Sequence, residues 1–269
     1  MIRVLTNDGL ESASIEALKA LGAEVVNEHF DQDVLGEKLK GFDAVVIRSA
    51  TKLTSDIFAA EEGGNLKLAI RAGVGIDNID IPAAESKGVT VRNTPSASSD
   101  SVAELAIGHM FALARFIAIA NYTMRNGQWN KKKYQGTEIA GKTLGIVGMG
   151  RIGQSLAKKA TALGMKVVYY TIEGKHDDLD YDFVSFEEVL KTSDFISLHV
   201  PYDKAAGSLI GKKELQLMKN TAYLINCARG KVVDEAALLE ALDNGEIAGA
   251  GIDVFEEEPT KNEKLVNHE

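Results

Sequence analysis

TLGIVGMGRIG, residues 143–153, is the stretch of this sequence that decides its fold. The strand-forming residues Thr143–Val147 lead directly into three glycines spaced as GxGxxG. Apolar residues then recur on one helical face, at Ile152, Leu156, Ala160 and Leu163. A GxGxxG motif alone is weak evidence, because glycine is common in loops. A strand before it and a helix after it predict a dinucleotide-binding Rossmann unit.

Each glycine of this motif has a separate physical role. Gly148 permits the tight turn, Gly150 lets the backbone approach a pyrophosphate, and Gly153 allows the helix to pack closely on the strand. The helix start at Arg151 and Ile152 supplies amide donors and a partial positive charge. We therefore expect these residues to hold the cofactor.

The end of the next expected strand, Lys166–Tyr170, lacks a feature of such folds. An acidic residue usually stands there and binds the ribose hydroxyls, but this chain has Thr171, which does not repel a 2′-phosphate. No arginine follows, and Lys175 and His176 are outnumbered by acidic residues, Asp177, Asp178, Asp180 and Asp182. We interpret this run as a solvated surface loop that disfavours a phosphate. The pattern favours NAD and leaves NADP open.

Composition indicates an ordinary soluble globular protein. The 269 residues are 45% hydrophobic and 26% charged, and the formal net charge is −9. This charge argues against non-specific binding to nucleic acid or to an anionic membrane surface. The single cysteine, Cys227, rules out an intrachain disulfide and suits a reducing cytoplasm. The polar start MIRVLTNDGL is not a signal peptide.

Strand and helix patterns alternate along the chain, which predicts an α/β protein with parallel sheets. The expected strands are Arg3–Leu5, Ala44–Ile47, Leu68–Ala72, Thr90–Arg92, Thr143–Gly148, Lys166–Tyr170, Phe195–Val200, Ala222–Asn226 and Ala250–Val254. The expected N-terminal helices are Ser12–Leu21, Asp33–Leu39 and Ile81–Ser86. After Pro95 the alternation gives way to a long helical stretch, and a second strand–helix series follows it. We therefore predict two Rossmann-like or flavodoxin-like domains, residues 1–96 and 97–269.

One long helix is expected between these domains. Ser98, Ser99 or Asp100 can cap it, and it runs to about Asn126. It is apolar nearly all round, which predicts burial on several sides. Its Glu104, with His109 and Arg115, argues against a membrane span.

With these motifs in place, the chain resembles the D-isomer-specific 2-hydroxyacid dehydrogenase family over essentially its whole length. Each shared motif is modest alone, but the set in this order is specific. The motifs are Arg48–Thr51 (RSAT), Arg71–Asn78 (RAGVGIDN), Asn93–Pro95 (NTP), Gly141–Ile146 (GKTLGI), Leu198–Pro201 (LHVP), Ile225–Gly230 (INCARG) and Asp253–Pro259 (DVFEEEP).

The resemblance implies hydride transfer between NAD and a 2-hydroxy acid or 2-keto acid. Arg229 matches the arginine that holds the substrate carboxylate and carbonyl, a task that suits a planar guanidinium. Glu258 matches the glutamate that pairs with the catalytic histidine. A nearby carboxylate favours the charged imidazolium, which can donate a proton. Glu256 and Glu257 are then expected to be solvated neighbours.

The resemblance also implies the residues that line the cofactor. They are Val74, His199, Val200, Pro201, Cys227, Ala228 and Asp253, of which Asp253 lies near the nicotinamide carboxamide. Val74 and Val200 can also be plain core residues. Cys227 is expected to be a wall residue and not a nucleophile, since no base stands beside it in sequence.

Substrate choice has thinner support. The resemblance is greatest to the members that oxidise 3-phosphoglycerate in serine biosynthesis, and it places Arg48 and Ser49 at the far end of the substrate. The segment Gly73–Gly75 is expected to contact the substrate as well. Lys131, in a basic run after Trp129, resembles a patch that reaches a neighbouring subunit's phosphate site, although such a run can be a solvated face. A hydroxypyruvate or glyoxylate reductase remains an alternative.

The histidines leave the catalytic pair incomplete. The family's catalytic histidine follows the last nucleotide-domain strand in a Pro-His context, and this chain contains no Pro-His dipeptide. We expect that histidine, with the segment that completes the N-terminal domain, a few residues beyond Glu269, and we expect His268 to be a bystander. No metal-ligand spacing occurs, so no metal is expected.

Two classes of function therefore stay open. One is an NAD-dependent dehydrogenase that acts on a small 2-hydroxy acid and forms a homodimer or larger homo-oligomer, with little turnover from residues 1–269 alone. The other is an NAD-binding regulatory protein of the same fold. Arg48, Arg229 and Glu258 favour the enzyme, because a sensor has little use for a carboxylate clamp.

Overall fold

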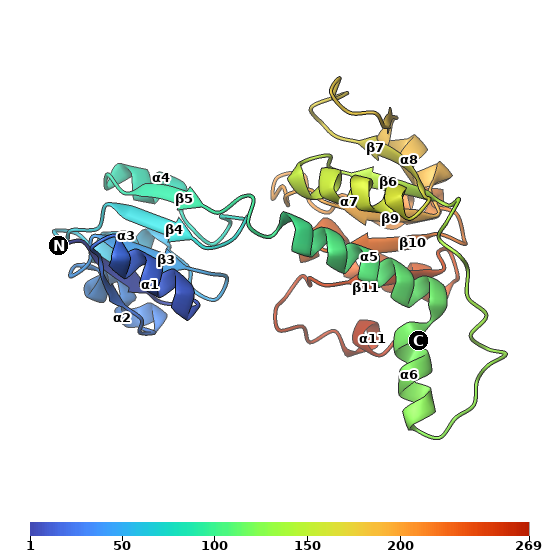
Figure 1. The fold of residues 1–269 in the computed structure, drawn as a ribbon, viewed down its shortest axis with the longest axis horizontal. Coiled ribbons are helices and arrows are strands. Elements are labelled where there is room, and N and C mark those ends of the chain that lie inside the picture. The colour runs from blue at the N-terminus through green and yellow to red at the C-terminus, as the bar shows by residue number, and fades with distance from the viewer. Residues whose placement is uncertain (269) are drawn as a thin grey trace. The chain divides into compact units, whose positions relative to one another are not determined.

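The computed structural model describes residues 1–268, and these form two compact units. Unit 1 comprises Met1–Ser98 and unit 2 begins at Ser99. This division lies two residues after the predicted boundary at residues 96 and 97. Figure 1 shows that each unit has its own sheet with helices packed beside it.

Unit 1 is built on a parallel five-stranded sheet. Its strands are β1 (Arg3–Thr6), β2 (Glu24–Val26), β3 (Ala44–Ile47), β4 (Leu68–Arg71) and β5 (Thr90–Asn93). Their spatial order is β2-β1-β3-β4-β5, which is the flavodoxin-like order. In such sheets ligands bind outside the carboxyl ends of the strands, where the order reverses.

Alternating side chains of β3 pack on opposite faces of this sheet. Val45 and Ile47 enter the main core, while Ala44 and Val46 enter a smaller cluster on the other face. The main core also takes residues of α2 (Gln32–Leu39), α3 (Ser55–Ala60) and α4 (Ile81–Ser86). The remaining helix, α1 (Ser12–Ala20), buries no residue completely.

Unit 2 contains a parallel six-stranded sheet. Its strands are β6 (Thr143–Val147), β7 (Lys166–Tyr170), β8 (Asp182–Phe183), β9 (Phe195–Leu198), β10 (Tyr223–Asn226) and β11 (Gly249–Ile252). The order β11-β10-β9-β6-β7-β8 is that of a Rossmann domain, with its reversal between β6 and β9. The predicted fold class, two parallel α/β sheets, is therefore confirmed.

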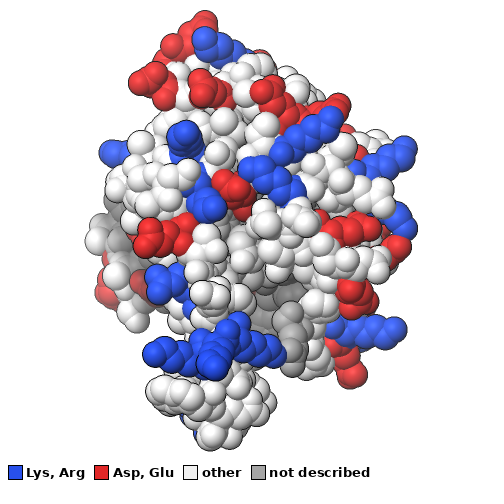
Figure 2. Space-filling model, turned by 90° about the vertical axis from the view of Figure 1, so that its right-hand side faces the viewer, with Lys and Arg blue, Asp and Glu red and all other residues white. Residues whose placement is uncertain are grey.

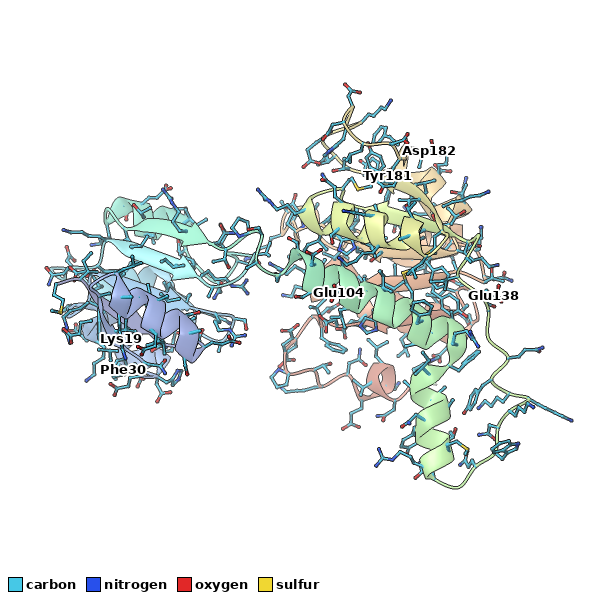
Figure 3. The ribbon with its side chains drawn as sticks, in the orientation of Figure 1. Lys19, Phe30, Glu104, Glu138, Tyr181 and Asp182 are labelled. Carbon is cyan, nitrogen blue, oxygen red and sulfur yellow. The ribbon has the colours of Figure 1, made fainter. Side chains whose placement is uncertain are left out.

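Helices cover both faces of the second sheet. On one face, α5 (Ser99–Arg115) and α7 (Arg151–Ala162) share a core with β6. On the other, α8 (Phe186–Thr192), α9 (Lys212–Leu217) and α10 (Glu235–Asp243) form a second core. The remaining elements are α6 (Ile117–Arg125), η1 (Gly230–Val232) and α11 (Glu263–Val266). Figure 3 labels Glu104 on α5, and its carboxylate lies 3.8 Å from Lys159 Nζ on α7.

The prediction of a single long helix up to Asn126 is wrong. It breaks at Phe116, which adopts a left-handed φ of 54°, so α5 and α6 meet at an angle of 61°. The Phe116 ring stacks on Tyr134 with centroids 5.6 Å apart, and Thr137 N donates to Ala114 O at 2.8 Å. The segment after α6 thus returns to the end of α5 and holds the break.

Burial differs between the two halves of the expected helix. In α5, Ala103, Ala106, Met110 and Ala114 are buried, as predicted, whereas α6 buries only Thr123. Within residues 1–268 no single helix is long and apolar enough to cross a membrane, and α5 and α6 reach that length and composition only as a bent pair.

Candidate functional site

The glycine loop at Gly148 joins the ends of three strands of unit 2. Gly148 has a left-handed φ of 97°, and its N–H donates to Tyr170 O, at the end of β7, at 2.8 Å. A Cβ on Gly148 would lie 2.5 Å from His199 O, just after β9. Only glycine fits both the backbone conformation and this contact.

The other two glycines of the motif meet different surroundings. A Cβ on Gly153 would lie 2.3 Å from Gly148 O, so the absence of a side chain lets α7 pack closely on the loop. A Cβ on Gly150 would meet nothing within 4 Å. The space beside Gly150 is therefore open, next to the start of α7 at Arg151, where the first N–H groups of a helix have no intrahelical partner. These residues fit a dinucleotide pyrophosphate.

His199 lies at the strand reversal beside this loop. Its Nε2 is 2.9 Å from Ser197 Oγ, and within residues 1–268 its buried Nδ1 has no hydrogen-bond partner. Burial lowers the pKa of His199 to about 4, so the imidazole is neutral at pH 7. Val200 and Pro201 follow it at the carboxyl end of β9, where the resemblance places cofactor contacts.

Thr171 follows β7 directly beside the glycine loop and is buried. Its Oγ1 donates to the carboxylate of Glu173, a residue to which we assigned no function from sequence. This hydrogen bond lowers the pKa of Glu173. The only signal in the sequence was an acidic residue two positions after the strand-end threonine.

The loop after β10 is held by one amide side chain. Asn226 Nδ2 donates to Arg229 O at 2.9 Å, and Asn226 Oδ1 accepts from Ala228 N at 3.1 Å. Cys227, inside this loop, is buried, and burial together with Asp253 raises its pKa to about 12. Its sulfur is a neutral thiol at pH 7, which agrees with a wall residue and not with a nucleophile.

Arg229 and Glu258 lie on two loops that touch. A Cβ on Gly230 would lie 1.8 Å from Phe255 O, so the loop after β10 rests on the loop after β11. The half-buried Arg229 donates from Nη1 to Ala228 O at 2.7 Å. Glu258, which is exposed, accepts from Phe255 N at 3.1 Å. Both predicted catalytic residues thus belong to one edge of one sheet.

Glu256 is exposed, as expected, but it also forms hydrogen bonds that the sequence did not indicate. Its Oε1 accepts from Glu235 N at 3.0 Å, at the start of α10, and its own N–H donates to Glu235 Oε1 at 2.7 Å. These reciprocal bonds fix the loop after β11 on α10. Glu257, by contrast, forms only an exposed ion pair with Lys261 at 2.8 Å among the interactions described.

In unit 1, the segment Arg48–Thr51 follows β3 and is held from two sides. The Asp8 carboxylate accepts from Arg48 N at 2.5 Å and from Thr51 N at 3.2 Å. Asn78 Nδ2 donates to Arg48 O and to Thr51 O, each at 2.7 Å. The backbone is therefore fixed while the side chains of Arg48 and Ser49 stay exposed. Sequence reasoning missed Asp8 and gave Asn78 no role.

The segment Gly73–Gly75 follows β4 at the same edge of unit 1. Asn93 Nδ2 donates to Val74 O at 2.6 Å, and Thr94 N donates to Gly73 O at 3.1 Å. A Cβ on Gly73 would lie 2.1 Å from Arg71 Nη1, so the guanidinium of Arg71 occupies the space of a side chain. Asn78 lies three residues after this segment, and its bonds to Arg48 O and Thr51 O therefore link the two stretches of unit 1 that were predicted to contact the substrate.

Lys131 lies in unit 2, on the segment after α6. It lines a groove of about 400 Å³ together with Arg115, Met124, Trp129 and Tyr134. Figure 2 shows basic side chains gathered over this segment and acidic side chains gathered over the segment after β7. Arg48 belongs to unit 1, whereas Lys131 belongs to unit 2.

The histidines are distributed over separate elements. His268 Nε2 lies 3.4 Å from Asp243, at the end of α10, and His29 Nε2 lies 3.6 Å from Asp31. His109 is on α5 against Gly251, and no metal-binding group of histidine, cysteine or acidic residues occurs among residues 1–268. The histidine predicted to pair with Glu258 would follow Glu269 and lies outside the described residues.

We predict that alanine at Gly150 weakens cofactor binding, whereas alanine at Gly153 lowers the stability of the fold. Gly150→Ala fills the open space at the helix start, so it weakens NADH binding at least about tenfold with unchanged unfolding. Gly153→Ala drives a methyl group into Gly148 O and lowers the free energy of unfolding by about 1–3 kcal/mol. Fluorescence titration and urea unfolding measure the two effects. Equal NADH affinity in Gly150→Ala and wild type contradicts the placement of the pyrophosphate.

We also predict a pH effect from His199. Its pKa is about 4 in the folded chain and about 6.5 when exposed, so the unfolded chain takes up the proton first. Stability is therefore full above pH 6.5 and falls as the pH drops towards 4. His199→Asn removes up to about 3 kcal/mol of this fall. Urea unfolding at pH 7, 6, 5 and 4 measures it, and parallel curves for the two proteins would refute the buried neutral imidazole.

Comparison with known proteins gives one consistent assignment. The profile of the D-isomer specific 2-hydroxyacid dehydrogenase NAD-binding domain matches residues 107–269. Hydroxypyruvate reductase of Thermotoga maritima is 45% identical over 262 residues, 97% of this chain and 85% of that protein. D-3-phosphoglycerate dehydrogenase of Methanocaldococcus jannaschii is 43% identical over 270 residues, which cover 99% of this chain but only 51% of that protein.

Solved structures agree with this assignment. The TT0316 protein of Thermus thermophilus superposes with a TM-score of 0.88 at 34% identity, over 97% of this chain and 84% of that one. A glyoxylate reductase of Paecilomyes thermophila superposes with a TM-score of 0.88 at 31% identity, over 99% of this chain and 85% of that one. Unit 2 is thus the NAD-binding domain, and the chain belongs to the D-isomer specific 2-hydroxyacid dehydrogenase family.

Proposed function

We propose that this chain carries the NAD site and the substrate clamp of a dehydrogenase that interconverts a small 2-hydroxy acid and its 2-keto acid, with 3-phosphoglycerate as the first substrate to test. The contact of Gly230 with Phe255 supports this proposal most directly, because it joins the loops of Arg229 and Glu258 at the carboxyl edge of the NAD-binding sheet. NAD, which the glycine loop Gly148–Gly153 would hold, would accept or return the hydride.

Arg229 is the group proposed to bind the substrate carboxylate. Its guanidinium carries a permanent charge and presents paired donors that match a carboxylate. Asn226 fixes the backbone on which it stands, through bonds to Arg229 O and Ala228 N. Rigid support of this kind lowers the cost of orienting the substrate.

Glu258 is proposed to hold a protonated imidazole. An exposed carboxylate near a histidine favours the charged imidazolium, which can protonate the alkoxide formed on reduction. We propose that the histidine is supplied beyond the described residues, because within them His268 has Asp243 as a carboxylate neighbour.

The proposal of a phosphorylated substrate rests on Arg48. Asp8 and Asn78 hold its backbone on both sides and leave its side chain exposed, as a cation that captures a phosphate requires. The relatives do not agree on one substrate: their names include D-3-phosphoglycerate dehydrogenase, hydroxypyruvate reductase and glyoxylate reductase. The 85% coverage of the Thermotoga protein favours hydroxypyruvate as the second candidate.

A second copy of the chain is the proposed partner. The apolar side chains of Ile117, Tyr122 and Met124 on α6 are 55%, 66% and 54% exposed, and Trp129 is 76% exposed. Apolar residues gathered in this way on one short segment mark an interaction surface. We propose a cytoplasmic homodimer that uses α6, in keeping with a single cysteine present as a neutral thiol.

We predict that substitutions of Arg229 and Arg48 differ in the range of substrates whose binding they weaken. Arg229→Lys raises KM for every 2-keto acid about tenfold or more, because a lysine cannot bind a carboxylate bidentately. Arg48→Ala raises KM by a similar factor for 3-phosphohydroxypyruvate only. NADH absorbance reports both, with the longest chain that the gene encodes and with Lys87→Ala as a surface control.

Three outcomes distinguish the candidates. Equal effects of Arg48→Ala on phosphorylated and unphosphorylated acids would favour hydroxypyruvate or glyoxylate as substrate. An unchanged KM in Arg229→Lys would contradict the proposal that Arg229 binds the substrate carboxylate. Tight NADH binding without turnover of any 2-keto acid would favour the regulatory protein of the same fold.

We predict that α6 controls oligomeric state. The double variant Ile117→Glu with Met124→Glu places charges in the apolar surface, so light scattering after size exclusion shows a monomer. Leu21→Glu, at an 85% exposed position of unit 1, leaves the dimer intact and serves as the control. A wild-type monomer at micromolar concentration would contradict the proposal.

A further inference from the structure

We propose that Glu173, held by Thr171, takes over the role of the acidic residue that this chain lacks at the end of β7, and that it makes the site select NAD over NADP. The inference rests on the NAD site assigned above and names the residue that recognises the ribose. The starting observation is the hydrogen bond from Thr171 Oγ1 to the Glu173 carboxylate.

The position of Thr171 satisfies the first requirement of this role. The N–H of Gly148 donates to Tyr170 O, so the residue after Tyr170 stands beside the turn of the glycine loop. In a Rossmann domain, the residue that binds the adenine ribose stands at this strand end. Thr171 is only 6% exposed, and its short side chain does not itself bring a charge to the site.

The backbone after β7 brings an acid back to that position. Gly174 N donates to Thr171 O at 3.2 Å, and Gly174 has a left-handed φ of 88°. This turn places Glu173 over the strand end, where its carboxylate meets the threonine hydroxyl. Ile172, at the outside of the turn, is 87% exposed. The acid is thus displaced by two residues in sequence while it returns to the threonine in space.

The chemistry of the pair suits ribose hydroxyls. Thr171 gives its one hydroxyl proton to Glu173, so both residues offer only acceptor lone pairs to a ligand. A ribose 2′-hydroxyl can donate to such acceptors. A 2′-phosphate is an acceptor group with about −1.5 to −2 charges at pH 7, and it meets like charge there.

The surrounding charges act in the same direction. The segment that returns to β8 carries further acidic residues and one lysine, and Figure 2 shows acidic side chains over it. Figure 3 labels Tyr181 and Asp182 at its end. These carboxylates and that of Glu173 are all exposed, so solvent screens them, but the hydrogen bond from Thr171 holds the Glu173 carboxylate at the strand end. Glu173 should therefore dominate the discrimination.

The test compares NADH and NADPH binding by cofactor fluorescence, which needs no turnover. We expect wild type to bind NADH about 100-fold more tightly than NADPH, because like-charge contact costs several kcal/mol. Glu173→Gln keeps the size of the side chain and removes its charge, so the ratio falls to about tenfold or less, mainly through tighter NADPH binding.

Further variants separate Glu173 from its surroundings. Asp178→Asn, the matched control in the same segment, leaves the ratio within about twofold of wild type, because the charge removed is an exposed one further along the segment from the strand end. Thr171→Val keeps the shape but releases Glu173, and it weakens NADH binding about threefold to tenfold. Thr171→Asp combined with Glu173→Gln restores the preference for NADH, and thermal unfolding of each variant checks that it is folded.

Two results would overturn the inference in distinguishable ways. If NADH binds but Glu173→Gln changes the ratio no more than Asp178→Asn does, Glu173 does not select the cofactor and the NAD site itself stands. If folded wild type binds neither cofactor, the proposed function fails, and this inference fails with it.

Discussion

The close approach of backbone to backbone at Gly148 is the contact on which the site in unit 2 depends. Its N–H bonds to Tyr170 O, and the space of its missing side chain is taken by His199 O. The ends of β6, β7 and β9 therefore meet at one point, which is also the reversal of strand order in the sheet. The open surface beside Gly150, the strand-end residue Thr171 and the neutral imidazole of His199 all take their positions from this contact.

The same physical device recurs elsewhere in the chain. Gly230 lets the loop after β10 rest on Phe255, and Gly73 leaves room for the guanidinium of Arg71. Amide side chains then lock the loops that glycine allows to approach: Asn226 bonds the loop of Arg229, and Asn78 bonds the loop of Arg48. Each cationic side chain proposed to bind substrate therefore stands on a fixed backbone, which favours a preorganised site.

Patterns with strong local signals were readable from the sequence. Each predicted strand is present, with ends that differ by at most two residues, because runs such as Ala44–Ile47 are buried on both faces. The strands that were missed, β2 and β8, are short edge strands with a partner on one side only. The break at Phe116 was also missed, since a left-handed aromatic residue has no sequence signature and depends on Tyr134.

The functional residues of the site also divide into those that could be predicted from the sequence and those that could not. The glycine roles and the place of Arg229 after a strand could be predicted, because they depend on spacing within one motif. Glu256 and Asp8 could not, since their partners Glu235 and Arg48 lie 21 and 40 residues away. Tertiary partners of this kind become visible only in the folded chain.

NAD is proposed to bind where the ends of β6, β7 and β9 meet. Hydrogen–deuterium exchange with and without saturating NADH tests it most directly. We expect slower exchange of the amides at residues 148–153, 171–174 and 199–201, and little change on the strands of unit 1 far from the carboxyl edge. NADH binding without protection of residues 148–153 would contradict the account.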